Sequence, residues 1–168
     1  MTGIASLAFS LSTALAALAA HAAPAFVPAS TAPADLIGTW MLDASESDFG
    51  RSPAPDSAMT IFTRADDRLV MTRKVWTSMG GGHRTVEFDQ ATDGEAGTGI
   101  ASRGDDIPSR AWWEEDVLVL EVEVNSNMGE IIVTDRMSLT DDDTLVFERL
   151  LDVPSMGEME QTIVYRRR

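Results

Sequence analysis

Apolar and polar residues alternate along most of the chain after residue 56, with a period of about two rather than the 3.6 of a helix. A further apolar run from Leu36 to Asp43 precedes them. The alternation predicts strands at residues 57–65, 68–78, 84–90, 96–102, 109–114, 117–125, 130–140, 144–153 and 159–167. Short connections rich in Gly, Asp and Pro force neighbouring strands to be antiparallel. We therefore expect an all-β, up-and-down meander that closes into a barrel, because closure removes exposed strand edges.

One short segment departs from the alternation. Residues 44–50 (Ala-Ser-Glu-Ser-Asp-Phe-Gly) are typical of a single helical turn that ends at a glycine. Residues 51–55 contain two prolines and predict an irregular crossing.

Turn lengths predict which side chains of the C-terminal strands face one another. A three-residue loop at 141–143 sets Leu139 opposite Leu145, Met137 opposite Phe147, and Asp135 opposite Arg149. A five-residue turn at 154–158 would set Phe147 opposite Tyr165, Arg149 opposite Ile163 and Leu151 opposite Gln161. A two-residue turn at 115–116 sets Trp113 opposite Leu118. The candidate ligand-binding residues on the inferred interior are Trp113, Leu120, Asp135, Met137, Phe147, Arg149, Gln161 and Tyr165.

Asp135 and Arg149 are a charged pair on an otherwise apolar face. A buried charge requires a partner, because an unpaired one costs several kcal/mol. One interpretation is a polar anchor that orients the head group of a ligand. The other is a structural ion pair, or a solvated pair at the mouth of the barrel.

Other candidate chemistry is weak. His83 is the only histidine after residue 22, the chain has no cysteine, and His83 has no second ligand at metal-binding spacing. Asp141, Asp142 and Asp143 lack the spaced ligands of a calcium loop and are typical of a solvated turn. The chain has no Gly-x-Ser-x-Gly motif, so a nucleophilic triad is not indicated. The sequence predicts no catalytic residue, no metal site and no cofactor.

The N-terminus is typical of a secretory signal. Residues 4–20 are apolar and rich in alanine, and Ala20-His21-Ala22 provides the small-x-small cleavage pattern. We expect a signal peptide at 1–22, a Pro/Ala-rich tether at 23–34 and a barrel domain at 35–168, with a retained membrane anchor as the alternative. Cleavage would give a secreted or periplasmic protein with no stable insertion in a membrane.

The charge excludes one class of partner. The formal net charge is −14, with 27 acidic residues against 13 lysines and arginines. Such an acidic chain repels phosphate backbones, so nucleic acid is not expected as a partner. The charge and composition do not predict an oligomeric state.

The run from Leu36 to Gly50 carries a family resemblance. Gly38-Thr39-Trp40 resembles the Gly-x-Trp signature of the lipocalins, and the whole run is similar to the start of small secreted bacterial lipocalin-like proteins. The resemblance implies an eight-stranded barrel, open at one end, although the strand-like runs number about ten. It also implies structural roles for Gly38 and Trp40. Trp40 would fill the closed end under a basic side chain, Arg166 or Arg167.

The resemblance implies a cavity that binds a small, largely apolar ligand. One alternative is a calycin-like enzyme of isomerase or cyclase type, in which Asp135, Arg149 or Tyr165 would be reactive. Another is an envelope interaction module whose core is filled by its own side chains. A cavity of about 300 Å³ or more would separate the first two functions from the third.

Overall fold

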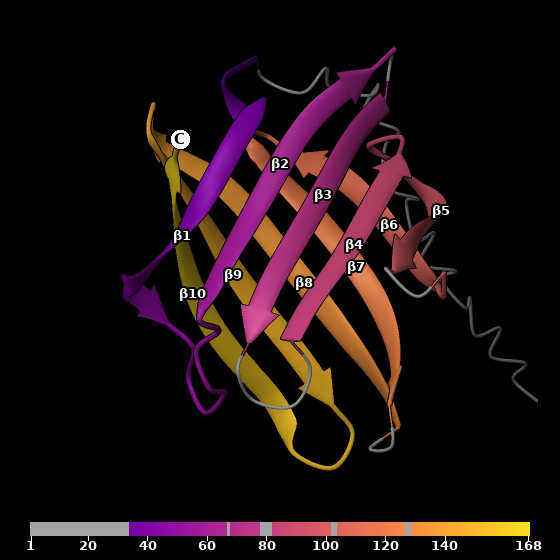
Figure 1. Ribbon diagram of the computed structural model, residues 1–168. Helices are drawn as coiled ribbons and strands as arrows, with labels where there is room; N and C mark the ends of the chain where they lie inside the picture. The colour runs from indigo at the N-terminus through magenta and orange to yellow at the C-terminus, as the bar shows by residue number, and fades with distance from the viewer. Residues whose placement is uncertain (1–33, 67, 78–81, 102–103, 127–128) are drawn as a thin grey trace, which may run out of the picture.

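Ten strands of the described residues follow one another along the chain and wrap into one closed antiparallel barrel (Figure 1). The computed structural model describes residues 34–168 except 67, 78–81, 102–103 and 127–128. The expected signal peptide and most of the tether lie outside these residues. A short 3₁₀ helix, η1 (Ala34–Leu36), precedes the strands, which are β1 (Gly38–Asp48), β2 (Ser57–Ala65), β3 (Arg68–Thr77), β4 (Gly82–Gln90), β5 (Asp93–Ala101), β6 (Asp106–Glu114), β7 (Val117–Ser126), β8 (Gly129–Asp141), β9 (Thr144–Val153) and β10 (Gly157–Arg167).

The all-β meander is confirmed, with ten strands in the barrel rather than the eight that the resemblance implied. Each strand pairs with the next, and β10 closes the barrel against β1. No helix among the residues that the structure describes is long and apolar enough to cross a membrane.

The helical turn expected at 44–50 is wrong, because β1 continues to Asp48 through an irregularity in its pairing with β10. Serine side chains support this irregular stretch. Ser45 Oγ donates to the Asp43 carboxylate at 2.6 Å, and Ser47 Oγ accepts a hydrogen bond from the backbone N–H of Val164 at 2.9 Å. The bond between Ser47 and Val164 joins β1 to β10 where their backbone pairing is irregular.

The predicted facing pairs of β6–β7 and β8–β9 are confirmed, including Asp135 opposite Arg149. The pairs of β9–β10 differ from the prediction by two residues. Val153 pairs with Gly157, so the turn has three residues rather than five, and Arg149 lies opposite Gln161. Gly157 permits the tighter turn, since its φ is +75°. A shift of two residues keeps every side chain on its predicted face.

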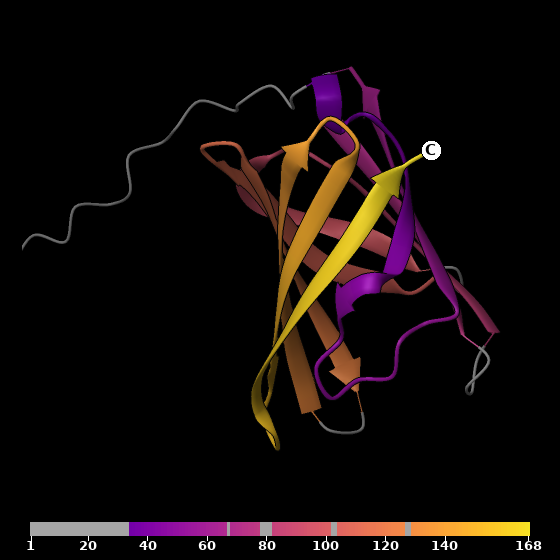
Figure 2. The same ribbon diagram turned by 90° about the vertical axis from the view of Figure 1, so that its left-hand side faces the viewer.

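Trp40 fills one end of the barrel, as the resemblance implied. Its side chain is fully buried, and its Nε1 donates to the carbonyl oxygen of Leu36 at 3.0 Å. The guanidinium of Arg167 lies over the indole ring, 4.2 Å from the ring centre. Arg167 is therefore the basic partner, whereas Arg166 forms ion pairs with Asp43 and Glu46. Figure 2 shows η1 and the C-terminus at this same end.

Gly38 allows Arg167 to reach this position. Its φ is +149°, and a Cβ atom built on it would lie 2.9 Å from Nη1 of Arg167. That Nη1 donates to the carbonyl oxygen of Ile37 at 3.2 Å, while Nε of the same side chain donates to that of Asp142 at 2.8 Å. One arginine thus ties the start of the domain to the β8–β9 turn.

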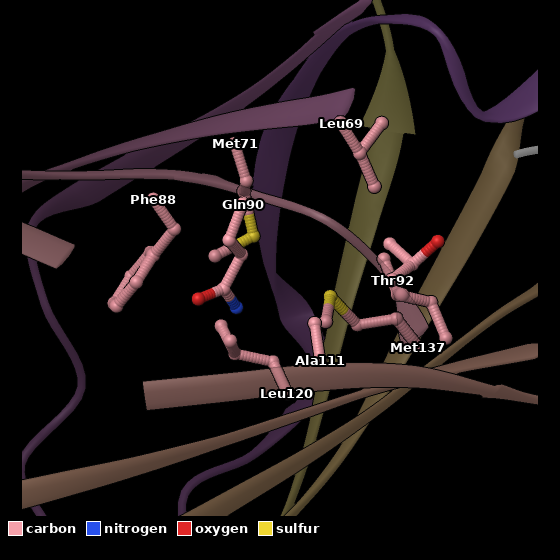
Figure 3. A pocket seen from close by; sticks show the side chains of 9 residues that line it. Leu69, Met71, Phe88, Gln90, Thr92, Ala111, Leu120 and Met137 are labelled. Atoms are coloured by element: carbon pink, nitrogen blue, oxygen red, sulfur yellow. The ribbon is translucent and has the colours of Figure 1, made fainter. Parts of the chain in front are cut away.

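The half of the barrel next to Trp40 is filled by its own side chains. Figure 3 shows where they converge, around a gap of only about 10 Å³. Gln90 lies in this packing, and its Oε1 accepts a hydrogen bond from Ser109 Oγ at 2.9 Å. The residues around the gap are Leu69, Met71, Phe88, Gln90, Thr92, Ala111, Leu118, Leu120 and Met137.

Replacing Trp40 with alanine should lower the free energy of unfolding by about 3–5 kcal/mol, because it removes a fully buried aromatic side chain. Trp76→Ala is the matched control, since Trp76 lies on the outer face of β3 and is only partly buried. Its loss should be less than about half as large. Urea unfolding measures both, and equal losses would contradict the assignment of Trp40 to the closed end.

Candidate functional site

Three charged side chains from three strands meet inside the barrel. Asp135 of β8 accepts two hydrogen bonds from Arg149 of β9, from Nε at 2.6 Å and from Nη2 at 2.9 Å. Arg73 of β3 donates a third bond from Nη1 to Oδ2 of Asp135 at 3.0 Å. Asp135 and Arg149 are cross-strand neighbours, whereas Arg73 approaches from a strand that is not paired with either of theirs. We call these residues the Arg73–Asp135–Arg149 cluster.

The cluster keeps a buried carboxylate ionised. Asp135 is 2% exposed, and burial alone would raise its pKa. The charges and hydrogen bonds of Arg149 and Arg73 outweigh burial and lower the pKa of Asp135 to about 2. Burial likewise opposes the charge of Arg149, but Asp135 raises the pKa of that guanidinium. With two cations and one anion, the cluster carries a net positive charge.

Two aromatic rings support the cluster from the closed half. The Arg73 guanidinium lies over the ring of Phe147, 4.7 Å from its centre. Phe147 in turn packs against Tyr165, with 4.9 Å between ring centres. These contacts hold the arginine by cation–π attraction as well as by its ion pair.

A cavity of about 400 Å³ extends from the two arginines of the cluster to the other end of the barrel. Much of its wall is apolar and consists of Leu42, Phe49, Pro53, Pro55, Ala58, Val75, Leu151 and Ile163. Its polar members are Ser52, Arg73, Thr77, Arg84, Arg149, Gln161 and Tyr165.

The segment between β1 and β2 crosses this end of the barrel (Figure 2). Gln161 holds it in place, because its Nε2 donates to the carbonyl oxygen of Phe49 at 3.1 Å and to Ser52 Oγ at 2.9 Å. The irregular crossing expected at 51–55 therefore contributes residues to the cavity wall.

The predicted ligand-binding residues divide between the two halves. Arg149, Gln161 and Tyr165 line the cavity, and Asp135 lies against it through its bonds to Arg149. The other four lie outside the lining of the cavity. Leu120 and Met137 surround the small gap, and Phe147 is fully buried. Trp113 donates a hydrogen bond from Nε1 to Thr92 Oγ1 at 3.0 Å. Their role in binding a ligand stays a prediction.

Sequence reasoning missed Arg73, Arg84 and the crossing segment. Arg73 follows the same alternation as Leu69, Met71 and Val75, so the inward face of β3 could have been assigned to it. Its contact with Asp135 could not be predicted from the sequence, because counting residues across hairpins relates only adjacent strands.

The remaining candidates lie elsewhere. His83 is exposed, 5.3 Å from the ring of Trp76 and 3.1 Å from Thr85 Oγ1. Asp141 accepts hydrogen bonds within its own turn, from the backbone N–H of Asp143 at 2.9 Å and from Thr144 Oγ1 at 3.0 Å. Within the described ranges, no group of three His, Cys, Asp or Glu residues could hold a metal ion.

A second hollow of about 500 Å³ lies along β8, β9 and β10. Outward-facing side chains, including Thr134, Glu148 and Leu150, form most of its lining. It lies mostly on the outer face of these strands and shares Arg149 and Gln161 with the lining of the interior cavity.

Fold and site together define a closed, ten-stranded antiparallel β-barrel with an internal cavity, an arrangement compatible with a calycin-like fold. No protein-family model matches the chain, and no curated protein matches it either.

Replacing Asp135 with asparagine should destabilise the fold by about 3–5 kcal/mol, because it leaves two buried guanidinium groups without a counter-charge. Asp89→Asn is the matched control. Asp89 pairs with Arg68 on the surface, where both side chains are about half exposed, and its loss should be about 1 kcal/mol or less. Equal losses in chemical denaturation would show that the buried cluster is not required for stability.

The stability contributed by Asp135 should depend on pH in a defined window. Its folded pKa of about 2 lies below the ordinary aspartate value of 3.8, so this stability is complete above about pH 4 and is lost as the pH falls towards 2. The difference in unfolding free energy between wild type and Asp135→Asn should therefore shrink by about 2 kcal/mol from pH 5 to pH 2. A constant difference would mean that the carboxylate is not stabilised in its ionised form.

Proposed function

We propose that this protein is an exported barrel that binds a small, largely apolar molecule in the cavity at its open end. The observation that carries the proposal is the uneven filling of the interior. The half next to Trp40 is packed down to a gap of about 10 Å³, whereas the other half contains an open cavity of about 400 Å³. Export rests on the signal-like N-terminal sequence alone.

The cavity has the properties of a ligand site. Its volume falls in the range of about 300–1,000 Å³ that is typical of small-molecule pockets. Apolar residues such as Val75, Leu151 and Ile163 provide favourable burial for an apolar molecule, while the arginines offer a few fixed polar contacts. This combination supports binding with a defined orientation.

The cavity also distinguishes between the alternatives. A module with a completely filled core would not enclose this volume. An enzyme would require a reactive group, and Asp135 is poorly suited because both its oxygens accept hydrogen bonds from arginines and its pKa is lowered to about 2. These contacts and the lowered pKa argue against Asp135 as the reactive group of such an enzyme.

Adjacent residues of β9 provide the test, since Leu151 lines the interior cavity and Leu150 lines the hollow on the outer face. An uncharged fluorescent dye such as Nile red should bind wild type with a rise in emission. Leu151→Trp should weaken binding about tenfold or more by filling the cavity, whereas Leu150→Trp should leave it unchanged. If Leu150→Trp weakens binding and Leu151→Trp does not, the dye binds on the outer face of the barrel. If the dye does not bind to wild type, the proposal is contradicted.

A further inference from the structure

We infer that the molecule held in the cavity carries a carboxylate group, and that Arg73 recognises it. The inference rests on the proposed function, because it specifies the chemical class of ligand for the same cavity. Two observations support the inference: the net charge of the cluster and the hydrogen-bond donors of Arg73.

The first observation is the imbalance of charge. Asp135 is the one acid of the cluster, and Arg149 alone already donates to both of its oxygens. Arg73 adds a second positive charge while contributing one hydrogen bond. A buried charge without a counter-charge is costly. An anion in the cavity would provide that counter-charge.

The second observation is which atoms of Arg73 have partners. Arg149 uses the edge of its guanidinium formed by Nε and Nη2 to bind the two oxygens of Asp135. Arg73 binds Asp135 through Nη1, and its own Nε and Nη2 are buried with no hydrogen-bond partner among the described residues. The same donor edge that holds a carboxylate on Arg149 is therefore unsatisfied on Arg73. Two parallel N–H donors match the two oxygens of a carboxylate.

A rotation of the Arg73 side chain would present this edge to the cavity. Its side chain is 13% exposed and forms part of the cavity lining. A rotation of the guanidinium towards the cavity would break its one hydrogen bond to Asp135, which keeps both bonds from Arg149, and would move it off the ring of Phe147. Since Nε and Nη2 have no other partners among the described residues, no further bond is lost.

The surroundings fit an acid with an apolar tail. Tyr165 and Arg149 line the cavity together with Phe49 and Pro53 of the crossing segment, which provide apolar surface. The chain as a whole has a net charge of −14, which opposes the approach of an anion at long range. The apolar tail is therefore required for affinity, and the head group fixes orientation.

Competition against Nile red with three C12 compounds tests the inference: the carboxylate, the alcohol and the phosphate monoester. Wild type should bind the carboxylate about 10- to 100-fold more tightly than the alcohol, the range for a charge-assisted pair of hydrogen bonds. Arg73→Met should abolish this preference, because it should weaken binding of the carboxylate much more than binding of the alcohol. The variant should fold, because Asp135 and Arg149 remain as a neutral pair.

Lys74→Met is the matched control. Lys74 follows Arg73 on β3 and faces outward, so the control removes the same charge from the exterior and should keep the preference. Arg73→Lys retains the charge without the paired donors and should reduce the preference partly. If Arg73→Met does not fold, this variant carries the test.

Each remaining outcome overturns a specific part of the account. Equal binding of the alcohol and the carboxylate would refute the acidic head group while leaving the proposed function intact. If the phosphate monoester binds more tightly than the carboxylate, the head group of the ligand is not a carboxylate. A preference that survives in both Arg73 variants would refute the role of Arg73, and failure of all three compounds and the dye to bind would refute the proposed function itself.

Discussion

The buried carboxylate of Asp135, held between two guanidinium groups, is the interaction on which the interior of this barrel depends. Arg149 reaches it from the neighbouring strand and Arg73 from a strand that is not adjacent to β8 or β9 in the barrel. The cluster therefore links opposite parts of the wall. It also marks a boundary, since the barrel is packed on the Trp40 side and hollow on the other.

A second arginine arrangement closes the packed end. Arg167 lies over Trp40 and bonds to backbone carbonyls on both sides of the barrel closure. Because the closed end is fixed by these contacts, the chain can tolerate an open cavity at the other end without losing its core. The two arginine sites thus have different consequences: one completes the packing, and the other leaves positive charge exposed to a cavity.

Much of the fold could be predicted from residue alternation, because a period of two assigns each side chain to a face. The Asp135–Arg149 pair was predictable for this reason. The turn itself is shorter than expected, since Asp141 pairs with Thr144, but an irregularity between Leu139 and Asp141 keeps the predicted register. The β9–β10 register was not predictable, because Pro154 to Gly157 is compatible with turns of different length and a shift of two leaves the faces unchanged. Residues 44–48 were misassigned because their serines, which support an irregular strand, are equally typical of a helix start.

The cavity could be predicted only in part. Arg149, Gln161 and Tyr165 followed from hairpin counting, whereas the approach of Arg73 to Asp135 depends on the curvature of the closed barrel.

The central claim is that the open half of the barrel holds a small molecule. Native mass spectrometry of the protein purified from its own host tests it most directly. The account predicts a complex heavier than the bare chain, which releases a small organic acid when the protein is unfolded. The bare polypeptide mass alone, under conditions that preserve the fold, would contradict it.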